Sequence, residues 1–397
     1  MSQRFAIRLH TFCLPIAVVL SALLIWFLAD SRGVKGQIAN SSGSQELPFL
    51  ELNKPIDRQM TGGQTHNYRL KLEAGQYIKV EIFQYWISVW PRLYDPAGNL
   101  VLELKLHNEN AETEMLSAIV EKGGDFRLEI ETLGVTEIRG SYRLTLATQQ
   151  KATPQDRLLV EADRMQLEAY ALARKGKWES AIPLSEKGVA QYEKVFGANH
   201  LELVEPLKLL AVLLMFQGDL VNREKVSKRM LHIQELALGR DHLNVAEGLL
   251  HLGSTYLGGT NWLESNEALA KSLLERALRM REALLKPNDM RIAQVASDLG
   301  ILHLSLSEYT QAEVLLRRAM TIAEQELGPA SYFVTMRWND LAEVKAVQGE
   351  YGEATALWER GVANAEKYHP GSPVYAAMMA NLVGCHRDDD GRSLNWH

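Results

Sequence analysis

A stretch of turn-forming residues recurs along the C-terminal half of the chain at a nearly constant interval. One copy contains Gly239, within Leu-Gly-Arg-Asp-His-Leu, and its counterparts begin at Gly197, Lys286, Gly328 and His369. The steps between successive copies are 42, 47, 42 and 41 residues. A period in this range is typical of a solenoid, in which each unit is too small to bury its own apolar face and packs against its neighbours. No other feature constrains the fold as strongly.

A second set of turn residues keeps the same interval and lies midway between the copies of the first. Its members are a small residue followed by a charged one: Gly176, Gly218, Ser307 and Gly349. Each unit is therefore expected to consist of a helix A, a tight turn, a helix B and a looser turn. Alanines follow three of the tight turns, where two helices must approach closely, at Ala181, Ala312 and Ala354.

Aliphatic residues recur at fixed positions of every expected helix B. This is a packing signature, because each unit presents the same face to its neighbour. One column is Leu184, Val226, Leu273, Leu315 and Leu357, and a second is Val189, Leu231, Leu278, Met320 and Val362. In the fourth unit this register predicts that Leu315 and Ala319 lie on the buried face of helix B.

These columns resemble the tetratricopeptide repeat, in the long variety found in kinesin light chains. In that variety helix B ends in Arg-Ala-Leu-x-Ile-x-Glu and is followed by Leu-Gly-x-Asp-His-Pro; Arg276-Ala277-Leu278 and Leu238-Gly239-Arg240-Asp241-His242 carry the likeness here. A glutamate recurs in all five units, at Glu193, Glu235, Glu282, Glu324 and Glu366. The resemblance covers residues 156–385 and implies an all-α solenoid of five helix pairs plus a final helix.

Two units depart from the family pattern. The second has Arg223 and Met230 where small residues are usual, so its helices are expected to pack more loosely. The third carries an insertion around residues 258–262, which is expected to lengthen the turn within that repeat.

The first 30 residues predict a signal-anchor transmembrane segment. Arg4 and Arg8 precede an apolar run of 18 residues from Phe12 to Ala29, and as a helix this run would span roughly 27 Å, close to the hydrocarbon thickness of a bilayer. The bulky Phe27 stands where a cleavable signal peptide needs small residues, which favours an uncleaved anchor. Positive charge on the N-terminal flank exceeds that beyond the run, where Asp30 offsets Arg32, and this favours an N-terminus inside the cell. The body of the protein would then lie outside the cytoplasm, or be secreted if the segment is cleaved.

A flexible linker is expected at residues 31–47, followed by an all-β sandwich at residues 48–148. Polar Ser, Gly and Asn residues in the linker offer nothing to bury. Apolar residues then alternate with polar ones in five segments, for example Ile78, Val80 and Ile82, and turn residues such as Asp95-Pro96-Ala97-Gly98 separate them. Seven or eight short strands over this length indicate an antiparallel, jelly-roll-like sandwich.

The order of the sandwich motifs resembles the bacterial pre-peptidase C-terminal domain. The likeness rests on Glu73-Ala74-Gly75-Gln76-Tyr77, on Arg92-Leu93-Tyr94-Asp95-Pro96 and on Gly123-Gly124-Asp125-Phe126. Such domains accompany secreted proteins, and in one bacterial group the sandwich precedes tetratricopeptide repeats and then a caspase-like CHAT peptidase domain. No peptidase domain follows the repeats in this sequence, where residues 386–397 form a short tail.

The sequence carries no pattern of catalytic, cofactor-binding or metal-ligating residues. Its eleven histidines include no second ligand at helical spacing, and neither His-Glu-x-x-His nor Cys-x-x-Cys occurs. The net charge of −6 argues against nucleic-acid binding, which depends on Lys and Arg. We therefore expect a protein that is not an enzyme and has no cofactor.

The family resemblance implies that helix A of each unit lines a concave groove for a protein or peptide partner. Counting back from the tight turns gives two inward columns. The first is Asp163, Glu205, Glu247, Gln294 and Met336, and the second is Gln166, Lys208, Leu250, Ser297 and Asn339. The acids of the first three units predict a basic or amine-bearing partner segment. The alternative is that Glu205 and Glu247 only stabilise the first turns of their helices, where the macrodipole favours acids.

The favoured function is thus a membrane-anchored extracytoplasmic scaffold that binds protein or peptide partners through its repeats. An alternative is the sensor part of a CHAT-type peptidase system whose catalytic domain is missing or encoded separately. A third hypothesis, carbohydrate binding by the sandwich, rests on Tyr85, Trp86 and Trp90, although aromatic residues near alternating strands are more often part of the core.

Overall fold

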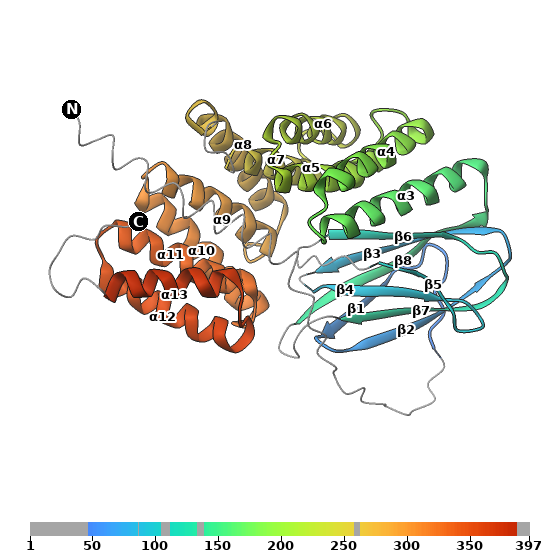
Figure 1. Ribbon diagram of the computed structural model, residues 1–397, viewed down its shortest axis with the longest axis horizontal. Coiled ribbons are helices and arrows are strands. Elements are labelled where there is room, and N and C mark those ends of the chain that lie inside the picture. Colours follow the sequence, from blue (N-terminus) through green and yellow to red (C-terminus); the bar gives the residue numbers. More distant parts are fainter. Residues whose placement is uncertain (1–46, 86, 105–111, 133–138, 258–262, 387–397) are drawn as a thin grey trace. The chain divides into compact units, whose positions relative to one another are not determined.

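The computed structural model describes residues 47–85, 87–104, 112–132, 139–257 and 263–386 (Figure 1). The chain divides into two compact units. The described residues up to Ala198 form the first, named here the sandwich unit, and those from Asn199 form the second, named the solenoid unit.

The sandwich unit contains two four-stranded antiparallel sheets, with strand orders β1-β8-β3-β6 and β2-β7-β4-β5 (Figure 1). The strands are β1 (Ile56–Thr61), β2 (Thr65–Leu72), β3 (Gln76–Tyr85), β4 (Val89–Tyr94), β5 (Leu100–Glu103), β6 (Glu112–Ile119), β7 (Gly124–Thr132) and β8 (Arg139–Lys151). Strand β1 pairs with β8, β2 with β7, β3 with β6 and β4 with β5. These four pairs are those of a long hairpin rolled onto itself, which is the jelly-roll arrangement.

The predicted alternation sets which side chains enter the core between the sheets. Ile78, Val80 and Ile82 of β3 are fully buried, as are Leu128 and Ile130 of β7. Successive side chains of a strand point to opposite faces, so the polar residues between them face outward. The antiparallel β-region expected from the sequence is therefore confirmed.

Helices α3 (Pro154–Ala173) and α4 (Trp178–Phe196) belong to the sandwich unit as well. Thr153 and Asp156 form a capping box that starts α3. The helix contacts β6, because Asp163 accepts a hydrogen bond from the Ser117 hydroxyl, and Leu167 packs against the sandwich core. This compact unit thus extends beyond residue 148, where the sequence placed the end of the sandwich, and includes the first helix pair.

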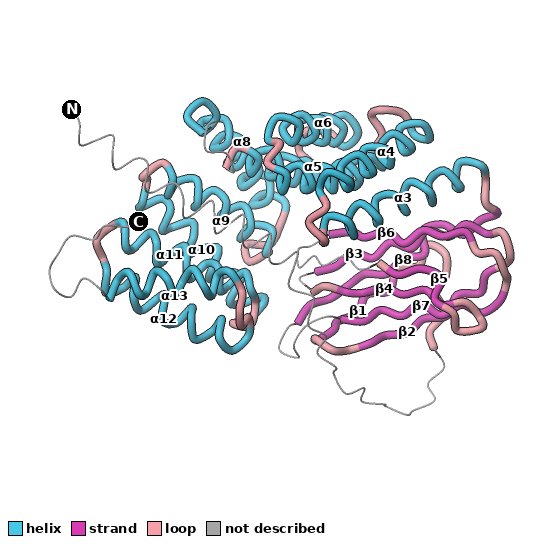
Figure 2. The backbone as a smooth tube through the Cα atoms, viewed as in Figure 1, coloured by secondary structure: helices cyan, strands magenta, loops and turns pink. Residues whose placement is uncertain are grey.

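The solenoid unit is built from helices alone, drawn in cyan in Figure 2. After η1 (Leu201–Leu203) come α5 (Val204–Gln217), α6 (Leu220–Leu238), α7 (Leu243–Thr255), α8 (Leu263–Leu284), α9 (Met290–Ser305), α10 (Tyr309–Leu327), α11 (Tyr332–Val347), α12 (Tyr351–Tyr368) and α13 (Pro373–His386). Odd-numbered helices from α5 to α11 are the A helices and even-numbered ones are the B helices. Gly218 and Ser307 adopt positive φ values of 79° and 61° in the predicted tight turns. Ser307 accepts this left-handed conformation although it has a Cβ.

The buried column of the B helices lies one residue later than the sequence register predicted. Leu315 is only half-buried, whereas Leu316 is fully buried and Ala319 is buried as expected. A Cβ atom at Gly300 of α9 would lie 2.8 Å from Cγ of Leu316, so this glycine permits the close approach of α9 and α10. Leu274 and Trp358 occupy the equivalent buried position of the neighbouring units.

Ion pairs connect successive B helices at equivalent positions. Arg276 of α8 contacts Glu235 of α6 at 2.9 Å, and Arg360 of α12 contacts Glu324 of α10 at 3.4 Å. Arg318 of α10 pairs with Glu282 of α8 in the same way. Three members of the glutamate column noted in the sequence therefore have a structural role, since Glu235, Glu282 and Glu324 each bind an arginine of the next repeat.

No helix of the described residues is long and apolar enough to cross a membrane. The apolar run at residues 12–29, the linker, the insertion at residues 258–262 and the tail lie outside these residues. The expectations for them stay predictions.

Candidate partner-binding site

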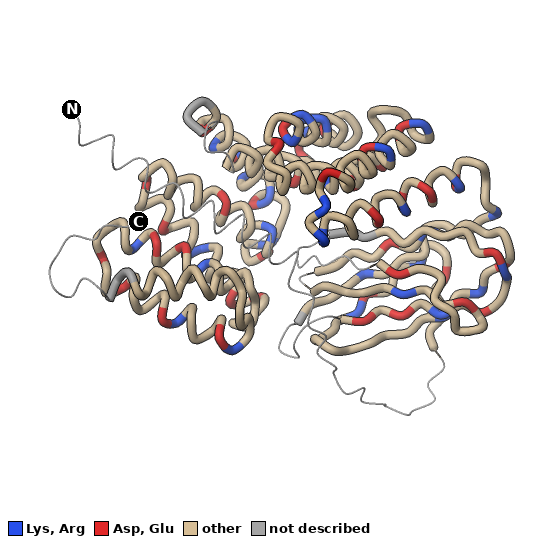
Figure 3. The backbone as a smooth tube through the Cα atoms, viewed as in Figure 1, with Lys and Arg blue, Asp and Glu red and all other residues tan. Residues whose placement is uncertain are grey.

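Half-buried polar side chains follow one another along the A helices of the solenoid unit. We name this set the polar row; its members are Glu205 and Lys208 of α5, Glu247, His251 and Ser254 of α7, Gln294 and Asp298 of α9, and Asp340 and Glu343 of α11. The spacing of the three α7 members, at i, i+4 and i+7, places them on one helix face. Figure 3 shows acidic and basic residues distributed over the helices of this unit.

The row begins with a compensated cluster on α5 and α7. The Lys208 ammonium lies 2.8 Å from Glu205 and 3.7 Å from Glu247, and His251 lies 3.7 Å from Glu247. Burial opposes ionisation of Glu247, but the charges of Lys208, His251 and Arg281 outweigh it and lower the pKa of Glu247 to about 2. These two carboxylates therefore do not make this part of the row acidic.

Farther along the row, the carboxylates of α9 and α11 are less well compensated. Ser254 of α7 donates a hydrogen bond of 2.6 Å to Asp298 of α9, yet burial raises the pKa of Asp298 above its usual range. Burial also raises the pKa of Asp340, although Arg337 contacts this carboxylate at 2.8 Å. Such shifts indicate that these groups hold their negative charge at a free-energy cost.

Glu343 has the strongest shift of the three. Burial and the neighbouring Asp340 carboxylate raise the pKa of Glu343 to about 8, although Asn339 donates a hydrogen bond of 2.7 Å to it. The two parts of the row therefore differ in charge compensation. The carboxylates on α5 and α7 are paired with positive charges, whereas those on α9 and α11 would be stabilised by an additional positive charge.

The structure places two predicted groove residues outside the polar row. Asp163 accepts hydrogen bonds from Ser117 and Tyr192, and Gln166 exchanges hydrogen bonds with Ser185 at 2.7 Å and 3.0 Å. Both residues thus hold together elements of the sandwich unit. Their partners on β6 and α4 could not be inferred from the repeat pattern.

Within the solenoid unit, most residues of the first predicted column lie in the polar row, whereas most residues of the second are buried between helices. Glu205, Glu247 and Gln294 of the first column lie in the polar row, and Gln294 accepts a hydrogen bond of 3.1 Å from Arg281. The second column instead contributes to helix packing, with Leu250 at 4%, Ser297 at 1% and Asn339 at 1% exposure. Lys208 is the member of that column that joins the row.

The residues that sequence reasoning missed lie one position later, at His251, Asp298 and Asp340. A shift of one residue rotates a side chain by about 100° around the helix axis. One residue can therefore be buried between helices while the next residue lies in the polar row. The signal was present in the sequence, because these three polar residues recur at the steps of 47 and 42 residues.

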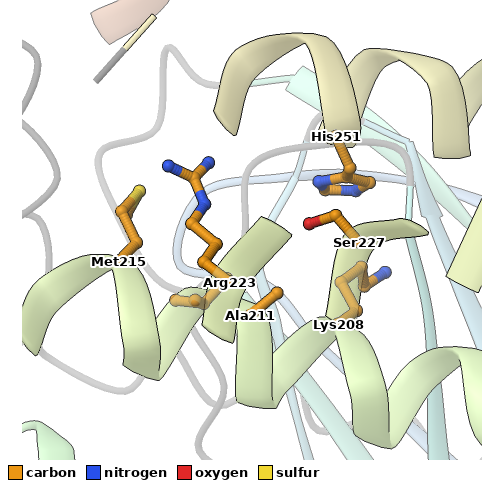
Figure 4. A pocket seen from close by; sticks show the side chains of 7 residues that line it. Lys208, Ala211, Met215, Arg223, Ser227 and His251 are labelled. Atoms are coloured by element: carbon orange, nitrogen blue, oxygen red, sulfur yellow. The ribbon is translucent and has the colours of Figure 1, made fainter. Parts of the chain in front are cut away.

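A hollow with about 230 Å³ of empty space opens beside the compensated cluster (Figure 4). Its walls are formed by Lys208, Ala211, Val212 and Met215 of α5, Arg223 and Ser227 of α6, and His251 of α7. Arg223 is only 8% exposed, and burial lowers the pKa of its guanidinium to about 10. In the view of Figure 4, the guanidinium stands on the Met215 side and the His251 ring above the Ser227 hydroxyl.

Within the described ranges, no group of three or more His, Cys, Asp or Glu side chains is arranged to hold a metal ion. The buried His303 instead contacts Glu308, which also binds Lys271 at 2.8 Å. His242 caps α7 by accepting a hydrogen bond from the Asn244 amide.

Comparison with known proteins identifies the repeats. A family model of the tetratricopeptide repeat matches residues 254–325, so this part of the chain consists of such repeats. Among curated proteins, none matches the chain.

Several solved structures are similar to part of the chain. The putative kinesin light chain of Podosopora anserina, with nearly identical TPR-like repeats, is 19% identical, covers 53% of this chain and 96% of its own, and has a TM-score of 0.45. BtubC (BKLC) from P. vanneervenii is 19% identical over 59% of this chain and 84% of its own, with a TM-score of 0.42. A Rap protein complexed with Competence and Sporulation Factor is 16% identical, covers 61% of this chain and 67% of its own, and has a TM-score of 0.47.

Proposed function

We propose that this chain is a scaffold that binds a protein or peptide partner along the polar row. The observation that carries this proposal is the set of half-buried ionisable side chains on successive A helices. Burying charged groups costs free energy unless they gain partners, and aliphatic residues would pack the same helices without that cost. A binding role explains why the row is polar, and solenoids of tetratricopeptide repeats present extended surfaces of this kind.

The row favours a partner segment with a basic group opposite α9 and α11. Asp298, Asp340 and Glu343 all have raised pKa values, so a Lys or Arg side chain nearby would stabilise their ionised forms. This location differs from the one expected from the sequence, which placed the acidic part in the first three units. Glu205 and Glu247 are already paired with Lys208.

We further propose that the scaffold is anchored in a membrane with its body outside the cytoplasm. The support for this is the sequence of residues 1–30, in which a basic leader precedes an apolar run of membrane-spanning length. In such an arrangement the sandwich unit would serve as a spacer between the anchor and the repeats.

The sandwich unit offers little support for carbohydrate binding. Sugars bind to proteins through exposed aromatic faces, but Arg92 covers the Trp90 ring at 4.4 Å from its centroid. Arg127 covers Tyr94 in the same way at 4.1 Å. These guanidinium groups already use one face of each ring in a cation–π contact.

The proposed function is tested by capturing partners from solubilised membranes with the full chain. A variant that combines Asp298→Asn and Glu343→Gln removes two carboxylates of the row and conserves side-chain volume. The control, Glu359→Gln, removes a carboxylate from the exposed surface of α12. We expect the double variant to lose the captured partner without any decrease in its melting temperature, whereas the control keeps both the partner and the wild-type melting temperature.

The result that contradicts the proposal is equal capture by the double variant and the wild type. Loss of capture that accompanies a lower melting temperature would also contradict it, because the two carboxylates would then act through the fold. Identification of the captured protein and of the segment that binds follows from mass spectrometry of cross-linked peptides.

A further inference from the structure

The hollow beside α5, α6 and α7 arises from two substitutions within the repeat pattern. Four helix pairs have a buried alanine near the start of helix B, at Ala181, Ala270, Ala312 and Ala354, whereas α6 has Arg223. One turn farther along, Leu274, Leu316 and Trp358 fill the space between the helices of their repeats. The residue at that position is a serine in both α4 and α6. Ser185 of α4 hydrogen-bonds to Gln166, whereas Ser227 of α6 lies beside a space that Arg223 lines.

Arg223 differs from the other buried cations of the solenoid unit. Arg281 donates to the carbonyl oxygen of Arg291 at 2.5 Å, Arg337 contacts Asp340 at 2.8 Å, and Lys345 contacts Glu313 at 2.9 Å. The Arg223 side chain has no hydrogen bond or ion pair with any residue in the described part of the chain, and its backbone amide donates to the Asp219 carbonyl oxygen. Asp298 acts on it electrostatically, but the Asp298 carboxylate is held by Ser254.

We propose that Arg223 binds a carboxylate group of the partner segment in this hollow. A guanidinium buried to more than nine-tenths and without a partner is unfavourable, and a carboxylate would supply two acceptor oxygens in the planar geometry that its N–H groups match. The His251 ring also lines the hollow and can hydrogen-bond to the same group, whereas the Ser227 hydroxyl is already hydrogen-bonded to Thr255. This inference rests on the proposed function, because it names the chemistry of one subsite of the same surface.

The charge of the residues that line the hollow favours a single carboxylate. No acidic residue lines the hollow, and the charge of Lys208 is compensated by Glu205 and Glu247. One uncompensated positive charge therefore remains, which matches a monoanion better than a phosphate dianion.

The partner segment would then carry charges of both signs. Its carboxylate would lie at α5 to α7 and its basic group at α9 and α11, where Asp298, Asp340 and Glu343 stand. Such a pattern would also fix the direction in which the segment binds, because the reversed orientation would bring like charges together.

The test uses NMR signals of the arginine Nε–H groups in the isotope-labelled full chain, titrated with sodium acetate. Sodium chloride of equal ionic strength is the control. The Arg223 signal, identified by its loss in Arg223→Ala, is expected to shift saturably with acetate alone. The signal of Arg281, whose guanidinium already donates to Arg291 and Gln294, should not move. Since alanine occupies this position in other repeats, Arg223→Ala should fold.

Acetate affinity in Arg223→Ala, followed through the His251 ring signals, should fall by about tenfold to a hundredfold, as expected for a lost charge-assisted hydrogen bond. Arg223→Lys should restore part of it. Acetyl-glycylglycine, with a terminal carboxylate, and acetyl-glutamic acid α-amide, with a side-chain carboxylate, then show by their relative affinities which source the site prefers.

An Arg223 signal that does not saturate, or that moves equally with chloride, would overturn the inference. Tighter saturation by inorganic phosphate than by acetate would overturn the choice of a carboxylate. Acetate binding together with unchanged partner capture by the Asp298→Asn/Glu343→Gln variant would support the subsite and contradict the proposed function. Absence of acetate binding together with loss of partner capture by that variant would support the proposed function and contradict the subsite.

Discussion

The two units bury different kinds of side chain. The core cluster of the sandwich unit consists of aliphatic and aromatic residues, and none of its described residues is a buried Lys or Arg. Among the described residues of the solenoid unit, four such cations are buried, at Arg223, Arg281, Arg337 and Lys345. Since apolar residues suffice to fold the sandwich unit, the buried charges of the solenoid unit require a reason beyond hydrophobic packing.

The partners of these cations divide them into two groups. Lys345 lies among Glu313, Glu350 and Glu353, where it fixes the turn between α11 and α12. Arg281 and Arg337 similarly bind groups of the A helices. Arg223 and the carboxylates of α9 and α11 are the charges that the fold leaves poorly compensated. The comparison of the two units therefore separates charges that support the structure from charges that are available to a partner.

The largest expected effect on the free energy of unfolding comes from removing a buried apolar side chain of the solenoid unit. Trp358→Ala should lower the free energy of unfolding by about 3–5 kcal/mol, because the ring is 1% exposed and fills the space between α11, α12 and α13. The half-buried neighbour Leu357 provides the matched control, and Leu357→Ala should cost less than half as much. Denaturant unfolding of both variants measures this, and equal losses would mean that the buried column is assigned to the wrong position.

In the sandwich unit, Leu128→Ala should cost about 2–5 kcal/mol, because this side chain is fully buried between the sheets. None of the described Lys and Arg residues of the sandwich unit is buried, so we expect the loss to be the same at pH 5 and pH 9. Denaturant unfolding followed by near-ultraviolet circular dichroism at both values gives the answer. A loss that changes strongly with pH would remove the contrast drawn between the units.

Glu343→Gln should have a smaller effect, and one that depends on pH. The folded-state pKa of about 8 lies above the ordinary value of 4.5, so the folded protein retains a proton that the unfolded chain has released. The stability penalty of Glu343 therefore begins near pH 4.5, grows as the pH rises, and is complete above about pH 8. The variant should be more stable than the wild type by about 1–3 kcal/mol at pH 9 and nearly equal to it at pH 4.5. Equal effects at both values would exclude a raised pKa.

The smallest expected effect concerns the ion pairs between successive B helices. Arg276→Ala should cost about 0.2–1 kcal/mol, since the pair with Glu235 is only partly buried. The difference from the wild type should shrink in 1 M salt, where charges are screened within about 3 Å. A loss above 2 kcal/mol that persists in salt would show that these pairs hold the repeats together.

The sequence predicted the architecture better than it predicted the site. A period of about 42 residues and the alternation in the strands follow from local patterns, and both appear in the structure. The polar row required the rotation of each A helix, which a repeat pattern defines only to within a residue. Leu250 and Ser297 were therefore assigned to the groove although they are buried, and His251 and Asp298 were missed.

Contacts between distant segments were the other limit. Nothing in the pattern around Asp163 signals that Ser117 of β6 and Tyr192 of α4 bind its carboxylate. Arg223 was noted in the sequence as a departure from the repeat, but the hollow that it lines depends on Ser227 and on the position of α7. The hypothesis of a CHAT-type peptidase system stays a prediction.

The most direct test of the account is the pKa of Glu343, measured by carbon-13 NMR of its carboxyl group with and without the captured partner segment. The account predicts a pKa of about 8 in the unbound chain and a value near or below the ordinary 4.5 in the complex, because a basic side chain then lies beside the carboxylate. An unchanged pKa in a complex that has formed would show that the partner binds elsewhere and that the polar row is not its site.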